Sequence, residues 1–338
     1  MVSIRKSVVV TIAVVACAFL LCAPSVVAAK SLKKLRLTYA DWGVGSAVAY
    51  VGIDAGLFKK YDIEIEEVFI QDALTGGTQA LLGVDFVIGF GNPLPILQPI
   101  LEGADIVFLG SHVRMEQYDL GVSSDITAVK DLKGKKIGVS GLGRRSDLIV
   151  RVVLRRAGLD PLKDVQIVAA GFSPERVVAL SKNLVQGAPL NPEIAAQAKK
   201  LGLKVIDLKE VPVVSSLLMT TRTIIRKDEE AMRRFIKGYL TAIHYFLTHR
   251  TESVAIMKKY LTNADPGALE TMYDSFAAQL KPLPVPNGES VRALIDAVSV
   301  SDERAKSLKP LDLFDLRFLE QLKASGFIDD LYSEKVSL

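Results

Sequence analysis

The strongest candidate for chemistry in this sequence is the stretch Ser140-Gly-Leu-Gly-Arg-Arg-Ser-Asp147. An apolar run typical of a strand enters it, Gly143 precedes two arginines, and a helical pattern starts near Ser146. Unpaired N–H groups at a helix start attract anions, and Arg144 or Arg145 could donate paired hydrogen bonds to a carboxylate, sulfonate or phosphate. Ser146 offers an N-cap and a hydroxyl donor. The alternative interpretation is an ordinary capped turn with solvated arginines. The third glycine of a dinucleotide fingerprint is missing.

Further candidates follow the predicted strands of the N-terminal part of the chain. In an open parallel sheet, ligands bind outside the carboxyl ends of the strands. We therefore predict that residues at or directly after the end of each strand contact the ligand. These residues are Tyr39, Asp41, Trp42, Phe90, Asn92 and His112.

Three of these candidates also fit a structural role. Trp42, the single tryptophan, could form a stacking wall for a ligand or a plug in the core. Asn92 could cap the helix that follows it or offer its amide to a ligand. His112 fits a hydrogen-bonded structural group as well as a ligand contact.

Motifs for catalysis and metal binding are missing from the sequence. It contains no Gly-x-Ser-x-Gly elbow, no Walker loop and no His-Glu-x-x-His, and His244 and His249 are five residues apart, off a shared helix face. The cysteines, Cys17 and Cys22, lie in an N-terminal apolar segment, so its removal would leave no thiolate, disulfide or cysteine-based zinc site. We therefore predict no enzymatic activity, no metal and no cofactor.

The N-terminal segment predicts export. Arg5 and Lys6 form a basic start, and the apolar run from Ser7 ends in small residues at Ala29, which is typical of a cleaved secretory signal peptide over residues 1–29. We expect a periplasmic protein. Two alternatives stay open: the run approaches membrane-spanning length, and Val14-Val-Ala-Cys17 would suit lipid attachment at Cys17.

Composition sets the broad class. A chain of 338 residues with 49% hydrophobic content can bury a large core and suggests two domains of ordinary size. The formal net charge is +4 at pH 7, and the basic pairs are scattered, so we expect no nucleic-acid partner.

Strand and helix patterns alternate along the first two thirds of the chain, which predicts an α/β fold with mostly parallel sheets. Strands are expected at 35–39, 63–70, 85–90, 106–110, 118–122, 135–140, 165–169, 204–208 and 215–221. Helices are expected at 47–58, 77–82, 93–102, 146–157, 174–181 and 192–201, and then at 228–250, 251–260, 266–280, 289–299 and 313–325. The chain should cross between two lobes near 122–128 and 219–226. Lobe 1 would hold residues 30–123 and 220–338, and lobe 2 residues 124–219.

Several stretches together resemble the nitrate, taurine and sulfonate substrate-binding proteins of ABC importers and their thiamine-pyrimidine-binding relatives. Asp54-Ala-Gly-Leu-Phe-Lys-Lys-Tyr61 after the first strand resembles their opening unit. Gly76-Gly-Thr-Gln-Ala-Leu81 with Val84-Asp-Phe86 resembles their lobe-1 helix and short strand. Asp131-Leu-Lys-Gly-Lys-Lys-Ile-Gly-Val-Ser140, followed by Ala157-Gly-Leu-Asp-Pro161, resembles their lobe-2 signature. The resemblance extends over about residues 35–236. It rests on the combination of these motifs in this order rather than on any one of them.

The sequence departs from this family at two places. Asn183-Leu-Val-Gln-Gly-Ala188 stands where the family usually has Gly-x-Val-Asp-Ala, so the ligand contacts of this loop stay open. Asp41-Trp42 resembles the thiamine-pyrimidine branch, but Val44 and Gly45 replace its Pro-Asn element.

The resemblance implies a type II periplasmic binding protein, with two doubly wound sheets joined by a hinge and a helical C-terminal segment. Such a protein, acting as a monomer, would close around a small anionic or heteroaromatic molecule and deliver it to an ABC permease in the inner membrane. Two alternatives are a ligand-sensing domain outside an importer and an enzyme of the same fold that acts on a pyrimidine or aromatic precursor. The pyrimidine synthase of this fold uses a cysteine-rich iron motif, which this chain lacks.

Overall fold

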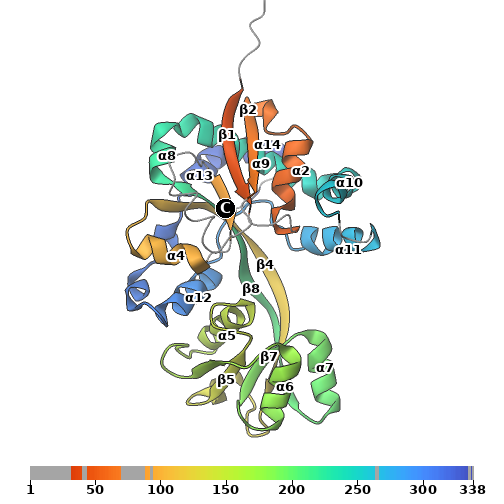
Figure 1. The fold of residues 1–338 in the computed structure, drawn as a ribbon, viewed down its shortest axis with the longest axis vertical. Coiled ribbons are helices and arrows are strands. Elements are labelled where there is room, and N and C mark those ends of the chain that lie inside the picture. Colours follow the sequence, from red (N-terminus) through yellow and green to blue (C-terminus); the bar gives the residue numbers. More distant parts are fainter. Residues whose placement is uncertain are drawn as a thin grey trace, which may run out of the picture. The chain divides into compact units, whose positions relative to one another are not determined.

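The chain folds into alternating strands and helices, as the α/β prediction requires (Figure 1). The structure is a computed structural model that describes residues 32–39, 44–69, 88–91, 94–262, 266–333 and 336. The proposed signal segment with Cys17 and Cys22, the expected helix 77–82 and the stretch from Gly76 to Phe86 lie outside these residues.

The described strands form one hydrogen-bonded sheet in the order β2-β1-β3-β8-β4-β7-β5-β6. They are β1 Lys33–Tyr39, β2 Ile63–Phe69, β3 Ile88–Gly91, β4 Ile106–Val122, β5 Lys136–Val139, β6 Gln166–Ala169, β7 Gly187–Leu190 and β8 Lys204–Thr221. At one end β1 pairs in parallel with β2 and β3, and at the other end β5 pairs in parallel with β6 and β7. Antiparallel pairing of β4 and β8 joins the two parallel groups.

Strands β4 and β8 are each continuous where the sequence predicts two short strands. The polar residues of 113–117 interrupt the apolar pattern, but they pair with residues 210–214 and so continue the ladder. Register shifts interrupt the pairing at His112/Val113 and Gln117/Asp119, and such irregularities let a strand bend and twist. Figure 1 shows the two long strands running side by side from one parallel group to the other.

Strand β7 has no counterpart among the predicted elements, because it contains Pro189. Proline lacks the N–H that a sheet ladder needs and argues against a central strand. Pro189 pairs with Leu120 of β4. On the side of β7 that faces β5, the pairing is confined to Gly187, so the N–H that Pro189 lacks is not needed for pairing with β5.

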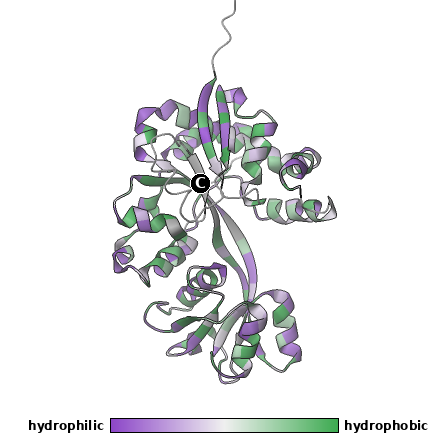
Figure 2. Ribbon diagram, in the orientation of Figure 1, coloured by the Kyte–Doolittle hydropathy of each residue, from purple (hydrophilic) through white to green (hydrophobic). Residues whose placement is uncertain are grey.

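Most of the helices follow the predicted positions, but the short helices at 222–227 and 327–332 were not predicted. In the described ranges they are α2 Ala47–Asp54, α4 Leu94–Leu101, α5 Arg145–Arg156, α6 Ser173–Ser181, α7 Pro192–Lys200, α8 Arg222–Lys227, α9 Glu229–Thr248, α10 Arg250–Tyr260, α11 Pro266–Ala277, α12 Gly288–Ser299, α13 Arg317–Ala324 and α14 Phe327–Tyr332. Hydrophilic and hydrophobic residues are interspersed along most of them, as expected for helices with one packed face (Figure 2). In that part of the chain, none of the helices combines the length and apolar character needed to cross a membrane.

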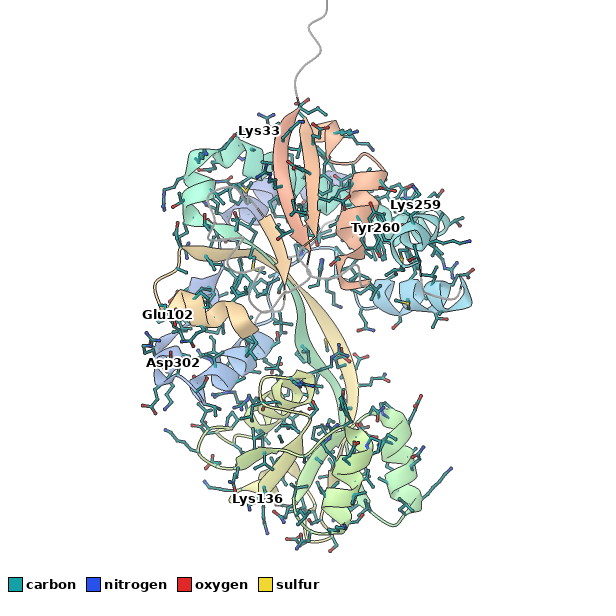
Figure 3. All side chains as sticks on the ribbon, viewed as in Figure 1. Lys33, Glu102, Lys136, Lys259, Tyr260 and Asp302 are labelled. Carbon is teal, nitrogen blue, oxygen red and sulfur yellow. The ribbon has the colours of Figure 1, made fainter. Side chains whose placement is uncertain are left out.

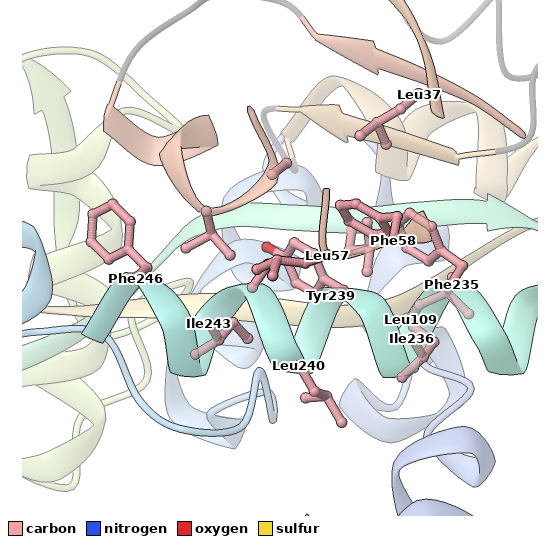
Figure 4. Packing of buried hydrophobic residues seen from close by; sticks show 14 of the residues in the cluster. Leu37, Leu57, Phe58, Leu109, Phe235, Ile236, Tyr239, Leu240, Ile243 and Phe246 are labelled. Carbon is pink, nitrogen blue, oxygen red and sulfur yellow. The ribbon is translucent and has the colours of Figure 1, made fainter. Parts of the chain in front are cut away.

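The largest core cluster surrounds helix α9 (Figure 4). Phe235, Tyr239 and Phe246 of α9 are fully or almost fully buried in a cluster that also contains Leu37 of β1 and Phe58. The rings of Phe58 and Phe235 stack with their centroids 5.3 Å apart. The C-terminal helical segment thus packs on the first strands of the chain.

Helix α10 is also fixed to the opening unit. The Lys259 ammonium lies 2.7 Å from a carboxylate oxygen of Asp54, and the Tyr260 hydroxyl donates to the other oxygen at 2.9 Å. Tyr260 also stacks on Tyr50 of α2, with the ring centroids 4.3 Å apart. Lys259 and Tyr260 are labelled in Figure 3. Asp54, part of the first motif noted above, therefore connects α2 with α10.

Helices α2 and α9 approach closely at Gly52, and Gly52→Ala should destabilise the protein. An added Cβ would lie 2.5 Å from the Ala242 Cβ and 3.1 Å from the Phe58 ring. Overpacking should outweigh the gain in helix propensity, so we expect a net loss of about 1–2 kcal/mol in urea unfolding. Gly288→Ala is the matched control, because a Cβ there meets nothing within 4 Å. Unchanged stability of the Gly52 variant would contradict the close approach.

Candidate functional site

Loops that follow β5, β6 and β7 lie at one edge of the sheet, because these strands run parallel. Val139 and Ala169, the last residues of β5 and β6, pair in register, and the Ala170 N–H donates to the Val139 carbonyl at 2.8 Å. We call residues 140–144, 170–172 and 191 the binding edge.

Side chains in the first turn of α5 hold the loop from residue 140 to 144 by hydrogen bonds. The Ser146 hydroxyl accepts from the Ser140 N–H at 2.8 Å and lies 2.8 Å from the Ser140 hydroxyl. Asp147 accepts from the Gly143 N–H at 2.6 Å, and Gly143 has φ +73°, a conformation that favours glycine. The expectation that Ser146 caps the helix is wrong: Arg144 is the N-cap residue, its side chain makes no cap bond, and Ser146 is buried in the first turn.

The two arginines of this loop differ in their surroundings. Arg145 lies 3.5 Å from a carboxylate oxygen of Glu116 on β4. Arg144 is exposed, and its side chain makes no ion pair with any residue that the structure describes. Arg144 is therefore the cation that this loop can offer to an anion.

A buried ion pair supports the loop from inside helix α5. The Arg151 Nε lies 2.9 Å from Asp147 Oδ1, and the side chains are 1% and 0% exposed. Burial raises the pKa of Asp147, and the nearby Arg151 acts in the opposite direction. Asp147 thus links the buried arginine to the backbone of Gly143.

The same loop contacts the other group of strands. A Cβ on Gly143 would lie 2.2 Å from Leu94 Cδ2, so the loop passes directly over the start of α4. Helix α4 follows β3 and the predicted site residue Asn92. The loop with Gly143 and the helix that follows Asn92, both of which carry predicted site residues at or next to them, therefore meet. Asn92 itself lies outside the described residues.

Part of the binding edge was missed by the sequence analysis. The buried Arg176 donates to the carbonyls of Pro189 and Gly171, both at 2.9 Å, and to the Ser173 hydroxyl at 2.8 Å. It thereby fixes the end of β7 to the loop after β6. The rule that selects residues after each strand, applied to the strand at 165–169, would have found Gly171 and Phe172.

Two side chains lie next to the backbone that Arg176 holds, namely Asn191 after β7 and Phe172 after β6. The Asn191 Oδ1 is buried and accepts no hydrogen bond from the described residues. Phe172, directly before α6, is 66% exposed. Both are unusual environments, since buried polar atoms normally have partners and large aromatic rings are normally covered.

The remaining predicted site residues are placed as follows. Tyr39 ends β1, opposite Phe69 of β2, and Phe90 lies in β3 opposite Leu218 of β8; their side chains are not described. Asp41 and Trp42 lie outside the described residues. Their predicted contacts with a ligand remain predictions.

His112 lies inside the largest core rather than at an open surface. It is 5% exposed, and its Nε2 is hydrogen-bonded to the Tyr239 hydroxyl. The Phe276 ring packs edge-on against it, with the ring centroids 6.2 Å apart. Burial lowers the pKa of His112 to about 4, so the ring is neutral at pH 7. This geometry favours the structural interpretation of His112 over a ligand contact.

Among the described residues, no three acidic or histidine side chains come together in a group that could hold a metal ion.

Comparisons with known proteins agree with this fold. The family model described as NMT1/THI5 like matches residues 45–253, more than half of the chain. A protein of Haemophilus influenzae named for thiamine biosynthesis is 31% identical over 152 residues. That match covers 44% of this chain and 45% of the relative, so it spans less than half of either protein.

Solved structures of sulfonate-binding proteins share the fold. The periplasmic aliphatic sulphonate-binding protein SsuA from Escherichia coli is 21% identical, with 85% of this chain and 92% of that chain covered and a TM-score of 0.54. The periplasmic sulfonate-binding protein SsuA from Methylobacillus flagellatus KT is 17% identical, with 89% and 97% covered and a TM-score of 0.57. The predicted periplasmic binding protein fold is confirmed.

Proposed function

Because the chain belongs to the NMT1/THI5-like family and has the fold of periplasmic binding proteins, we propose that it is the solute-binding component of an ABC importer. It captures a small organic anion in the periplasm and presents it, as a monomer, to a permease in the inner membrane. It performs no chemistry on the ligand. The sulfonate-binding relatives support an anionic ligand.

The observation that carries this proposal is the exposed Arg144 at the start of α5. Helix α5 has 12 residues, and its N-terminus lies at the carboxyl end of β5. A helix N-terminus and an arginine without an ion-pair partner in the described residues together suit a sulfonate or carboxylate. The contact between Gly143 and Leu94 brings this anion site next to the other half of the chain.

We assign residues 30–123 and 220–338 to lobe 1 and residues 124–219 to lobe 2, with the hinge in β4 and β8. The α5–α12 contact crosses this boundary. Arg155 donates to both carboxylate oxygens of Asp296, at 2.6 and 2.8 Å, and Asp296 is almost fully buried. A ligand that touches both lobes favours the closed state.

A pyrimidine is the second candidate ligand. The relative named for thiamine biosynthesis and the Asp41-Trp42 pair both favour it over an aliphatic sulfonate. A neutral pyrimidine would need no arginine, so the dependence of binding on Arg144 separates the two ligand classes.

The test is a thermal-shift screen of residues 30–338 against taurine, alkanesulfonates, aromatic carboxylates and pyrimidines, followed by calorimetry of any compound that binds. A ligand present at 100 times its Kd stabilises a protein by about 2.7 kcal/mol, which should raise the Tm of a chain of this length by about 4 °C. Arg144→Ala should weaken binding of an anion about tenfold or more, because charge-assisted hydrogen bonds are lost.

Arg226→Ala is the control, since Arg226 is an exposed arginine of α8 that lies near Asp105. It should leave the affinity unchanged. If no compound in the panel binds, the proposal is wrong. A compound that is converted to a product in the same incubation would support the enzyme alternative instead.

A further inference from the structure

We infer that Phe172 is the wall on which an aromatic ring of the ligand packs, so that the ligand is an aromatic anion rather than an aliphatic one. This inference rests on the proposed function and names the class of molecule that the binding edge selects. It rests on an exposed aromatic side chain and an exposed arginine that lie on loops leaving adjacent, paired strands.

The exposure of Phe172 is the first observation. Among the described residues with large, exposed hydrophobic side chains, it is the aromatic one. Leu142, in the neighbouring loop of the binding edge, is also exposed, at 47%. Leaving a side chain of this size in water forgoes about 1.5–3 kcal/mol of burial.

The second observation is that the backbone around Phe172 is fixed. Arg176 donates to the Gly171 carbonyl and to the Ser173 hydroxyl, on either side of Phe172. Arg176 is itself 2% exposed and also bonds to Pro189. A ring carried on such a framework is preorganised, which reduces the entropy lost when a ligand binds.

The third observation is the chemistry of the neighbours. Val139 and Ala169 pair in register, so the loop with Arg144 and the loop with Phe172 leave adjacent strands. The buried Asn191 Oδ1 lies at the end of β7 and lacks a donor among the described residues. A ring with an acidic group would engage both Phe172 and Arg144, whereas the Asn191 Oδ1 is covered by the protein.

The same exposed ring could instead contact the permease. Phe172 would then matter for transport but not for the binding of a small molecule. The loops of Phe172 and Arg144 leave adjacent strands, and this favours the ligand, because an anion site and an aromatic wall on paired strands suit one small molecule. The experiment below separates the two roles.

Calorimetry with benzenesulfonate and ethanesulfonate tests the inference. We expect residues 30–338 to bind benzenesulfonate at least about tenfold more tightly than ethanesulfonate, since aromatic pairs contribute beyond their buried area. Phe172→Ala should weaken benzenesulfonate binding about tenfold and leave ethanesulfonate binding within about twofold, whereas Phe172→Trp should retain the preference. Leu201→Ala is the control, because Leu201 is a comparably exposed apolar residue, at 73%, outside the binding edge.

Other results overturn the inference in distinguishable ways. Equal affinity for the two sulfonates, with Phe172→Ala affecting neither or both alike, removes the aromatic wall but leaves the proposed function standing. The same binding result with loss of uptake in cells assigns Phe172 to the permease. Binding of a neutral pyrimidine with no binding of either sulfonate excludes the aromatic anion. Failure of the folded protein to bind any compound removes both the inference and the proposed function.

Discussion

Arg151→Met is expected to lower the free energy of unfolding by about 3–5 kcal/mol, because it leaves a buried carboxylate without its partner. Arg151 and Asp147 are almost completely enclosed in α5, with the Nε and Oδ1 atoms 2.9 Å apart. Burial raises the pKa of Asp147, and removal of Arg151 would raise it further. A carboxyl group with a raised pKa in the folded state favours folding most in acid. The deficit of the variant should therefore shrink as the pH falls through the raised pKa of Asp147 and should be small at about pH 4, the value for an unfolded aspartate.

Urea unfolding at pH 7 and at pH 4 measures this effect. The double variant Arg151→Met with Asp147→Asn should recover much of the loss, because no charge stays buried and the asparagine can still accept from Gly143. Arg145→Met is the matched control, since Arg145 is mostly exposed and a surface change should cost less than about 0.5 kcal/mol. A loss below about 1 kcal/mol for Arg151→Met would contradict the buried pair.

Acid should destabilise the protein through His112 by about 2–3 kcal/mol between pH 7.5 and pH 4.5. Burial lowers the pKa of His112 from 6.5 to about 4. The unfolded chain takes up a proton below pH 6.5, whereas the folded chain does not. The contribution is therefore complete above pH 6.5 and is lost as the pH falls towards 4. Tyr239, the hydrogen-bond partner, does not titrate in this range, because burial raises its pKa.

His112→Gln should flatten this pH dependence, since glutamine can bond to Tyr239 but takes up no proton. Stability would be measured by urea unfolding at the two pH values. His249→Gln is the control, because His249 is exposed at the end of α9. An unchanged pH dependence in His112→Gln would show that other groups cause the acid sensitivity.

Much of the fold could be predicted from local patterns. Helix α9 begins after Asp228, whose side chain accepts from the Ala231 N–H, and the sequence predicts that residue as a cap. The strand, loop and helix at 136–156 were likewise predicted. Strand β7 was missed because the rule about proline is local, whereas the pairing of Pro189 depends on β4. The continuity of β4 and β8 also depends on a partner distant in sequence.

The candidate site was only partly predictable. The glycine-arginine loop is visible in the sequence because strand, glycines and helix follow each other directly. The inward orientation of Asp147 and Arg151 is not, since charges four residues apart on a helix usually indicate a solvated face. The support of Phe172 by Arg176 depends on the carbonyl of Pro189, 13 residues away. Such contacts follow from the packing of α6 on β7.

A crystal structure of residues 30–338 with benzenesulfonate tests the central claim most directly. The account predicts the sulfonate oxygens within about 3 Å of the Arg144 guanidinium or the N–H groups at the start of α5, with the ring against Phe172. A sulfonate bound away from residues 140–144, or a binding edge filled by the protein's own side chains, would contradict it.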